Sequence, residues 1–389
     1  MMEKLSIYIH IPFCVRKCEY CDFYSLCDLS LREKYVNALI AQIKSFRSEA
    51  KNRIVDTIFF GGGTPSLLSG DQVIRILKAI RSVFRVEDEA EISLEANPGT
   101  LNPEKLSAYH EAGINRLSIG LQSADAGELQ RLGRIHTREE FESSFLLARL
   151  EGFQNINVDI MYALPDQTEQ TLSDTLDYVI ALDPDHISFY GLRIEPDTPF
   201  GKDETIENAL PGEDTQADMY LASVEKLEKA GFLQYEISNF SKPGSECKHN
   251  LKNWKCREYL GFGPAAHSFF DGKRFSYKKD IDAFIADPLQ RVKLYDEFDC
   301  LSISEIAWQF VMLGFRLRLG IDITEYEERF FDDFEARYLE KMVPFIDKQY
   351  ILKTKNGYRL SRRGLLISNY ILSEILEFEQ APENSEEET

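Results

Sequence analysis

The sequence lacks any long hydrophobic run. Of its 389 residues, 43% are hydrophobic and 28% are charged, and no apolar stretch approaches the roughly 20 residues that a membrane-spanning helix needs. The N-terminal residues MMEKLSIYIHIPFC also lack a basic leader followed by a long apolar segment and a small-residue cleavage site. The composition therefore predicts a globular protein with no transmembrane segment and no signal peptide, and we expect a cytoplasmic location.

Positive charge is also scarce. The chain has 45 Lys and Arg residues against 65 Asp and Glu residues, which gives a formal net charge of -20. A surface of this sign repels polyanions, so we expect no general affinity for nucleic acid. The C-terminal residues EFEQAPENSEEET are acidic and poor in apolar side chains, which predicts a solvated acidic tail over residues 379–389.

Cysteine is too unevenly placed for a disulfide framework. The chain has seven cysteines, an odd number, and three of them lie within FCVRKCEYCDF. This pattern is typical of reduced thiols and metal binding. Cys14, Cys18 and Cys21 are spaced CxxxCxxC. Because a four-iron cluster normally takes four thiolates, three would leave one iron open.

Structural zinc and chance clustering are the alternatives to an iron–sulfur cluster at this cysteine loop. Zinc would require a fourth Cys or His at close spacing. Cys27, six residues after Cys21, is expected on the first helix and would be a weak fourth ligand. The residues alone leave both alternatives open, but the spacing favours an iron–sulfur cluster with an open iron.

Short apolar runs alternate with amphipathic segments through the first half of the chain. The runs predict strands near Ile7, Ile58, Leu94, Ile119, Val158 and Phe189. The segments predict helices over residues 30–49, 70–84, 102–112, 137–151 and 168–182. Such alternation indicates an α/β fold whose βα loops build a site at the strand ends. Because six units are too few for a closed eightfold barrel, we predict a partial, open TIM-like barrel of about six strands over residues 1–210. An open doubly wound sheet is the alternative.

The pattern changes after Pro211. A predicted helix over residues 213–231 is followed by a polar, glycine-rich stretch over residues 235–269, which we expect to be a long irregular functional loop. It belongs to a connecting region over residues 211–300. Over residues 301–378, two or three helices, a strand pair turning at Asn356 and Gly357, and a last helix predict a smaller winged-helix-like α+β domain.

The cysteine loop resembles the signature of radical S-adenosylmethionine proteins. The resemblance implies a [4Fe-4S] cluster on Cys14, Cys18 and Cys21, with the open iron chelated by the amino and carboxylate groups of S-adenosylmethionine. In that superfamily an electron from the cluster cleaves the sulfonium and produces a 5′-deoxyadenosyl radical. The protein then has to orient the cofactor and exclude solvent.

Other residues near the strand ends fit the same cofactor. Gly62, Gly63 and Thr64 belong to GGGTPS, in which glycine lets the backbone approach a ligand closely. Tyr8 and Tyr20 would supply aromatic surface beside the cluster, or would be ordinary core aromatics. By resemblance, four polar residues match positions that contact S-adenosylmethionine: Glu95, Gln122, Arg134 and Asp159. Any one of them alone would also suit a structural salt bridge or cap.

The resemblance spans nearly the whole chain and narrows to two branches, oxygen-independent coproporphyrinogen III oxidase and the HemW heme chaperones. It is carried by YIHIPFC, GGGTPS, EANP, GLQS, LPDQT, YEISNF and YLGFGPAAHS. The oxidase branch extends the cysteine motif to CxxxCxxCxC, whereas Phe23 occupies the last position here. It also carries a longer segment before the motif, while 13 residues precede Cys14. Both contrasts favour the HemW branch.

A third contrast lies in the segment HNLKNW, residues 249–254. It matches the HNxxYW pattern associated with heme in the HemW branch, except that Asn253 replaces Tyr. A histidine nitrogen is a standard axial ligand of heme iron, and a neighbouring Trp could cover the porphyrin. We therefore predict that His249 contacts heme; the alternative is a loop histidine held by polar neighbours. Cys247 and Cys256 flank it without a second knuckle to complete a metal site.

These features predict a chaperone that binds heme and transfers it to a client hemoprotein, for example a respiratory one. The expected cofactors are the [4Fe-4S] cluster, S-adenosylmethionine and heme, and a reductant such as flavodoxin is an expected partner. The alternative function is oxidative decarboxylation of coproporphyrinogen III propionates. Radical chemistry on an unknown substrate is a third possibility.

Overall fold

The computed structural model describes residues 3–376, so the predicted acidic tail lies outside the described residues. The chain divides into two compact units. The first contains the chain up to Asn253 together with Arg257–Leu301, and the second contains Trp254–Cys256 together with the residues after Leu301. None of the helices in residues 3–376 has the length and apolar content that crossing a membrane demands.

Six strands of the first unit form the parallel sheet that the sequence predicts. They are β1 (Glu3–Ile11), β2 (Arg53–Gly62), β3 (Arg85–Ala96), β4 (Arg116–Gln122), β5 (Ile156–Tyr162) and β6 (His186–Gly191), paired in parallel in this order. The next neighbour of β6 is β8 (Asn239–Ser241), and the other neighbour of β1 is β9 (Tyr259–Phe262). The strands therefore do not close into a ring, which confirms the open partial barrel.

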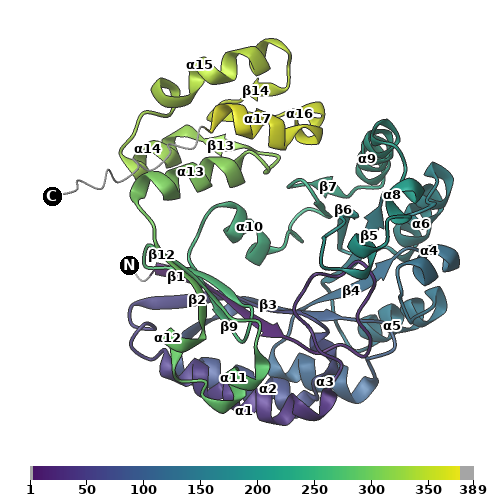
Figure 1. The fold of residues 1–389 in the computed structure, drawn as a ribbon, viewed down its shortest axis with the longest axis vertical. Coiled ribbons are helices and arrows are strands. Elements are labelled where there is room, and N and C mark those ends of the chain that lie inside the picture. The colour runs from purple at the N-terminus through teal and green to yellow at the C-terminus, as the bar shows by residue number, and fades with distance from the viewer. Residues whose placement is uncertain (1–2, 377–389) are drawn as a thin grey trace. The chain divides into compact units, whose positions relative to one another are not determined.

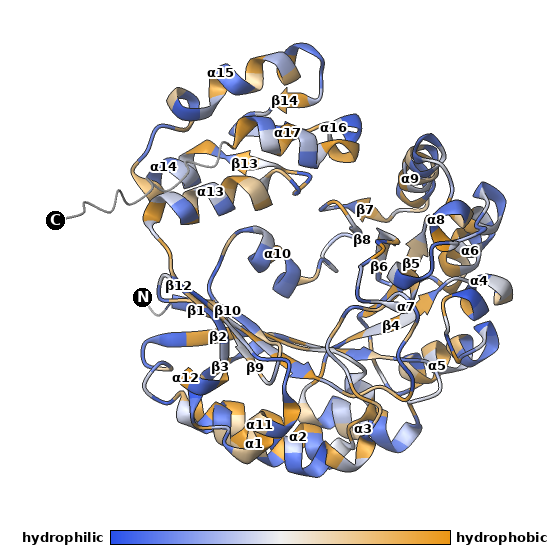
Figure 2. Ribbon diagram, viewed as in Figure 1, coloured by the Kyte–Doolittle hydropathy of each residue, from blue (hydrophilic) through white to orange (hydrophobic). Residues whose placement is uncertain are grey.

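Helices follow these strands and lie on the outer side of their arc (Figure 1). They are α1 (Arg32–Ser45), α2 (Gly70–Val83), α3 (Pro103–Ala112), α4 (Ala126–Arg131), α5 (Arg138–Leu150) and α6 (Glu169–Leu182). Each carries both hydrophilic and hydrophobic residues (Figure 2). A capping box starts α2, because the Ser69 hydroxyl accepts from the Gln72 amide while the Gln72 side chain accepts from the Ser69 amide.

The strands send apolar and polar side chains to opposite faces of the sheet. On β4, the buried Leu117 and Ile119 belong to the main hydrophobic core, while the residues between them line a cavity on the other face. The core therefore lies between the sheet and its outer helices. The inner face, which a closed barrel would fill with branched apolar side chains, is left polar here.

The sheet is larger than the sequence predicts. It has twelve strands in the order β12-β11-β10-β9-β1-β2-β3-β4-β5-β6-β8-β7. The helix predicted over residues 213–231 is present as α9 (Glu213–Lys229). The remaining elements of this part of the chain are α7 (Pro199–Lys202), α8 (Ile206–Ala209), β7 (Leu233–Gln234), α10 (Lys248–Trp254), β10 (His267–Phe270), β11 (Lys273–Tyr277), α11 (Ile281–Ala286), α12 (Arg291–Leu294) and β12 (Tyr295–Cys300). The edge strand β12 is exposed at every residue after Tyr295.

The expectation of an irregular loop over residues 235–269 was wrong. The segment contains β8, α10, β9 and β10, and β9 pairs in parallel with β1. Runs as short as YLGF and HSFF have little strand signal of their own, so pairing with a strand far away in the sequence decides their conformation. Figure 1 shows α10 on the inner side of the arc, opposite the outer helices.

The second unit combines helices with a three-stranded antiparallel sheet of order β13-β15-β14. Its elements are α13 (Ile303–Gly314), β13 (Ile321–Asp322), α14 (Ile323–Phe330), α15 (Phe334–Asp347), β14 (Ile351–Lys353), β15 (Gly357–Leu360), α16 (Arg362–Leu366) and α17 (Ser368–Ile375). Aromatic rings fill its core, where Tyr326 meets Phe334 edge-on with centroids 5.3 Å apart. The predicted α+β character and the strand pair β14–β15 are confirmed.

Candidate functional site

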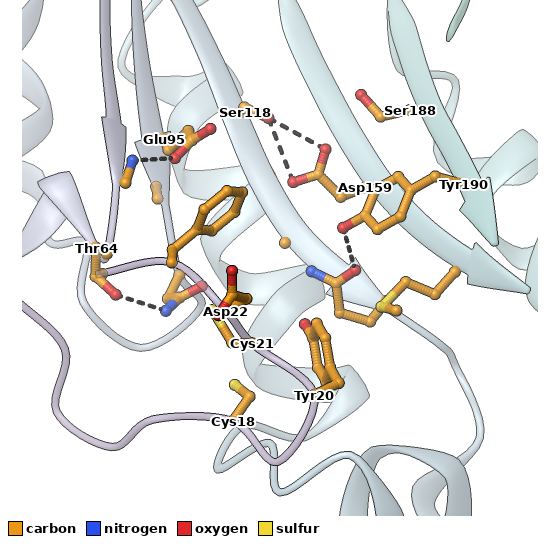
Figure 3. Close-up of a pocket in the computed structure, with 18 of the residues that line it drawn as sticks. Cys18, Tyr20, Cys21, Asp22, Thr64, Glu95, Ser118, Asp159, Ser188 and Tyr190 are labelled. Carbon is orange, nitrogen blue, oxygen red and sulfur yellow. Dashed lines mark hydrogen bonds between the residues drawn. The ribbon is translucent and has the colours of Figure 1, made fainter. Parts of the chain in front are cut away.

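A cavity of about 760 Å³ lies on the polar inner face of the sheet in the first unit. Its size is within the usual range for small-molecule sites. The structure brings together around it every residue that the sequence analysis assigned to a site: Tyr8, Cys14, Cys18, Tyr20, Cys21, Gly62, Gly63, Thr64, Glu95, Gln122, Arg134, Asp159 and His249. Figure 3 shows Cys18, Tyr20 and Cys21 at one side of the cavity, with Ser118, Asp159 and Ser188 farther along the strands.

The cysteine loop between β1 and α1 is fixed at its base by backbone hydrogen bonds. The Cys14 amide donates to the Leu26 carbonyl, and the Leu26 amide donates to the Pro12 carbonyl, each at 2.9 Å. Cys27 does not lie on the first helix as expected, because that helix begins only at Arg32. It is an exposed loop residue just before a short 3-10 turn.

The thiols of Cys14, Cys18 and Cys21 all line the cavity. Burial, together with the charges of the neighbouring cysteines, raises the pKa of the Cys14 thiol and raises that of Cys21 to about 11. Two donors meet the sulfur atoms, since Thr64 Oγ1 lies 3.5 Å from Cys14 Sγ and Arg134 Nη1 lies 3.6 Å from Cys18 Sγ. Positive charge and hydroxyl donors near buried sulfur stabilise thiolates, which are the ligands that iron–sulfur clusters require.

The cysteine loop offers three soft sulfur donors. No three His, Cys, Asp or Glu side chains in the described part of the chain converge tightly enough to hold one metal ion. Soft thiolate donors are the ligands that iron–sulfur clusters select.

The glycines of the second loop allow it to pack against the cysteine loop. The Gly63 amide donates to the Ile11 carbonyl at 2.9 Å, and the Thr64 amide donates to the Phe13 carbonyl at 2.7 Å. A Cβ at Gly63 would stand 2.7 Å from the Phe13 carbonyl oxygen, so no larger residue fits without a shift. Close backbone approach is therefore required here by a neighbouring loop, and Gly62 and Gly63 also line the cavity.

Arg134 and Gln122 are held at the end of β4. Arg134 Nη2 donates to the Gly120 carbonyl at 2.9 Å and to Asn97 Oδ1 at 3.0 Å. A Cβ at Gly120 would lie 3.0 Å from that same nitrogen, so the glycine leaves room for the guanidinium. Gln122 accepts from the Tyr190 hydroxyl at 2.9 Å. Both side chains are therefore oriented before any ligand arrives.

Glu95 and Asp159 are two partly buried carboxyl groups, and the charge of Asp159 acts on Glu95. Burial, together with the charge of Asp159, raises the pKa of Glu95 to about 8. Burial also raises the pKa of Asp159, although its oxygens accept from Asn157 Nδ2 at 2.7 Å and from Ser118 Oγ at 3.3 and 3.4 Å. A ligand cation between them would lower both pKa values, so this part of the cavity suits a positively charged group.

His249 lies on α10 rather than in a loop, which corrects the expected loop position. Its side chain is 3% exposed, and its ring packs against Phe59 with centroids 5.2 Å apart. Nδ1 is 3.1 Å from Thr57 Oγ1, and Nε2 makes no hydrogen bond to any residue that the structure describes. Burial lowers the pKa of His249 to about 3, so the imidazole is neutral.

Several lining residues escaped the sequence analysis. Arg116 and Ser118 share the inner face of β4 with Gln122, while Asn157 of β5 and Ser188 of β6 lie beside them. The available signal was the alternation of polar residues in RLSIGLQ and NVD, which points every second side chain to one face. These residues lie toward the starts of their strands, whereas the predicted site residues lie at the strand ends.

Comparisons with known proteins agree with this architecture. Residues 8–179 match the Radical SAM superfamily, and residues 301–367 match the HemN C-terminal domain. A solved structure of coproporphyrinogen III oxidase (HemN) from Escherichia coli, described as a radical SAM enzyme, has a TM-score of 0.84 at 23% identity, covering 96% of this chain and 90% of that one. At 23% sequence identity, this similarity shows that the two proteins share a fold, and it shows nothing further.

Sequence relatives give the family. The heme chaperone HemW of Haemophilus influenzae is 37% identical over 383 residues, which cover 95% of this chain and 97% of the relative. The heme chaperone HemW of Bacillus subtilis is 33% identical over 374 residues, covering 95% of this chain and 99% of the relative. With this identity along almost the full length of both chains, the protein belongs to the HemW family of the radical SAM superfamily.

Proposed function

We propose that this protein binds heme in the cavity and transfers it to client hemoproteins. The names of its relatives support this function, and the state of His249 is the observation that carries it. Thr57 Oγ1 donates its proton to Ser6 Oγ at 2.9 Å, so it accepts from Nδ1–H of His249. The lone pair then lies on Nε2, the nitrogen without a partner among the described residues. A neutral imidazole oriented in this way is the form that ligates heme iron.

In the same proposal, Cys14, Cys18 and Cys21 hold the [4Fe-4S] cluster that the family implies. S-adenosylmethionine would be held by the polar residues around them, chiefly Glu95 and Arg134. When bound, these cofactors supply one-electron chemistry. The chain itself provides positive charge beside Cys18 through Arg134 and carboxyl groups that suit a ligand cation. A reductant such as flavodoxin would act on the cluster as an outside partner.

A hemin titration of the cluster-reconstituted protein under anaerobic conditions tests the heme site. We expect stoichiometric binding with a shifted Soret band in the wild type, and loss of that spectrum in His249→Ala. His110→Ala is the matched control, because His110 packs against Phe153 outside the cavity. Unchanged affinity and spectrum in His249→Ala would remove His249 from the site.

Thr57→Val is a milder test of the same ligand. The change keeps the imidazole and nearly the same volume, but it removes the oxygen that accepts from Nδ1–H. Loss of such a supporting hydrogen bond typically weakens ligation by about tenfold to a hundredfold. Transfer of bound heme to an apo-hemoprotein, followed by absorbance, then tests the chaperone activity itself.

The oxidase activity is the competing function. Phe23 stands where the oxidase branch has a further cysteine, and its side chain is 65% exposed and lines the cavity. Incubation with coproporphyrinogen III, S-adenosylmethionine and a reductant should therefore yield no vinyl product. Product formation at catalytic turnover would replace the chaperone proposal with an enzymatic one.

A further inference from the structure

Arg116 is a buried cation without a partner in the described part of the chain. It is the first residue of β4, is 2% exposed and lines the cavity. No hydrogen bond or ion pair joins its guanidinium to the other residues that the structure describes, and its Nε atom is fully buried. An isolated buried charge is costly, so such a group is normally matched by an anion.

The acidic groups around Arg116 already serve other partners. Glu91 on β3 accepts from two backbone amides of α10, and Asp159 on β5 accepts from Ser118 and Asn157. Both influence Arg116 through space, as do Cys247 and Tyr235, but neither carboxylate comes within ion-pair distance of it. The guanidinium donors therefore remain available to a ligand in the cavity.

Arg116 and Gln122 lie at opposite ends of β4. Arg116 is six residues before Gln122 on the same strand, a distance of about 20 Å along the backbone. The same cavity is lined by His249, whose pKa the charge of Arg116 lowers, and by Asn239 and Asn253, whose side-chain oxygens have no hydrogen-bond partner among the described residues.

We propose that Arg116 binds a carboxylate of the ligand that occupies this inner end of the cavity. Resting on the proposed function, this carboxylate is a propionate of heme, whose iron would be bound by His249. A guanidinium offers two parallel N–H donors that match a carboxylate, so it would orient the macrocycle as well as attract it. Arg116 would then select tetrapyrroles with free propionates over esterified ones.

The test compares two ligands on the full-length, cluster-reconstituted protein. Hemin and its dimethyl ester are titrated in the same detergent into the wild type, Arg116→Gln, Arg116→Lys and the exposed control Arg138→Gln. The wild type should bind hemin about tenfold to a hundredfold more tightly than the ester. Arg116→Gln should lose the preference for hemin over the ester, while its affinity for the ester should equal that of the wild type. Arg116→Lys should keep part of this preference, and Arg138→Gln should keep all of it.

Each outcome separates this inference from the proposed function. Equal affinity of the wild type for hemin and the ester overturns the role of Arg116, and it does so even if the variants fail to fold. An equal loss for both ligands in a folded Arg116→Gln also overturns it, because the residue would then act on structure alone. If the wild type binds neither ligand, the proposed function fails and the inference fails with it.

Discussion

Glu91 is predicted to hold the helix that carries His249. Its side chain is 6% exposed, and its two oxygens accept from the Lys248 amide at 2.9 Å and the His249 amide at 3.0 Å. The thiol of Cys247 also lies 3.5 Å from it. The first amides of a helix have no partner within the helix, so a side chain from β3 satisfies them here. We therefore expect Glu91→Ala to release the start of α10 from the sheet.

The expected loss follows from the bonds removed. Each buried hydrogen bond to a charged group contributes about 1.5–3 kcal/mol, so removing two predicts a loss of about 3–6 kcal/mol in the free energy of unfolding. Glu91→Gln keeps the shape and one acceptor oxygen, and about half of that loss is expected. Glu89→Ala on the same strand removes an exposed carboxylate and should change stability by less than about 0.5 kcal/mol.

Two measurements on the same samples check this prediction. Chemical denaturation gives the change in the free energy of unfolding, and amide hydrogen exchange reports opening at Lys248 and His249. In Glu91→Ala both amides should exchange faster, while amides in the middle of β1 should be affected only through global stability. If Glu91→Ala matches Glu89→Ala in stability and the two amides keep their protection, the carboxylate does not anchor α10.

Three further predictions concern the other end of the cavity. Cys21→Ser should lose the iron and the visible absorbance of the reconstituted cluster, whereas Cys27→Ser should retain both; iron loss from the second variant alone would contradict the ligand set. Gly120→Ala places a methyl group 3.0 Å from the guanidinium of Arg134, so the affinity for S-adenosylmethionine, measured by equilibrium dialysis, should fall about tenfold. Gly212→Ala is the control that should leave this affinity unchanged, because a Cβ there meets nothing within 4 Å. The pKa of Glu95 is about 8 in the folded protein against an ordinary 4.5, so the folded chain holds an extra proton between these two pH values. The free energy of unfolding should therefore fall as the pH rises from about 5 to 8, by up to about 1.4 kcal/mol per pH unit. A Glu95→Gln variant whose stability has the same pH slope would refute this.

The strands β1 to β6 and the helices between them could be predicted because short sequence patterns indicate them. Runs such as VDTIFF and RLSIGL mark buried strands, and a capping box such as the one at Ser69 marks where a helix begins. The order β1 to β6 then follows from short right-handed crossovers. Because parallel strands end at the same edge, residues noted at separate strand ends were expected to meet, and they line one cavity.

The other features depend on contacts between residues far apart in the sequence, which a short segment cannot indicate. Helix α10 is only seven residues long, and its first amides are satisfied by a carboxylate 157 and 158 residues earlier in the chain. Strand β9 exists because it pairs with β1. Arg116 looks like an ordinary surface residue in the sequence, and only its place on the inner face of β4 turns it into a buried cation.

An open sheet leaves a strand at each end whose backbone could pair with another molecule. At one end β7 is only two residues long, which offers little to a second strand. At the other end β12 exposes Asp296, Glu297 and Asp299. A second copy of β12 lying alongside would bring these like charges within about 5 Å of one another. Electrostatic repulsion between the β12 strands of two copies therefore disfavours edge-to-edge aggregation.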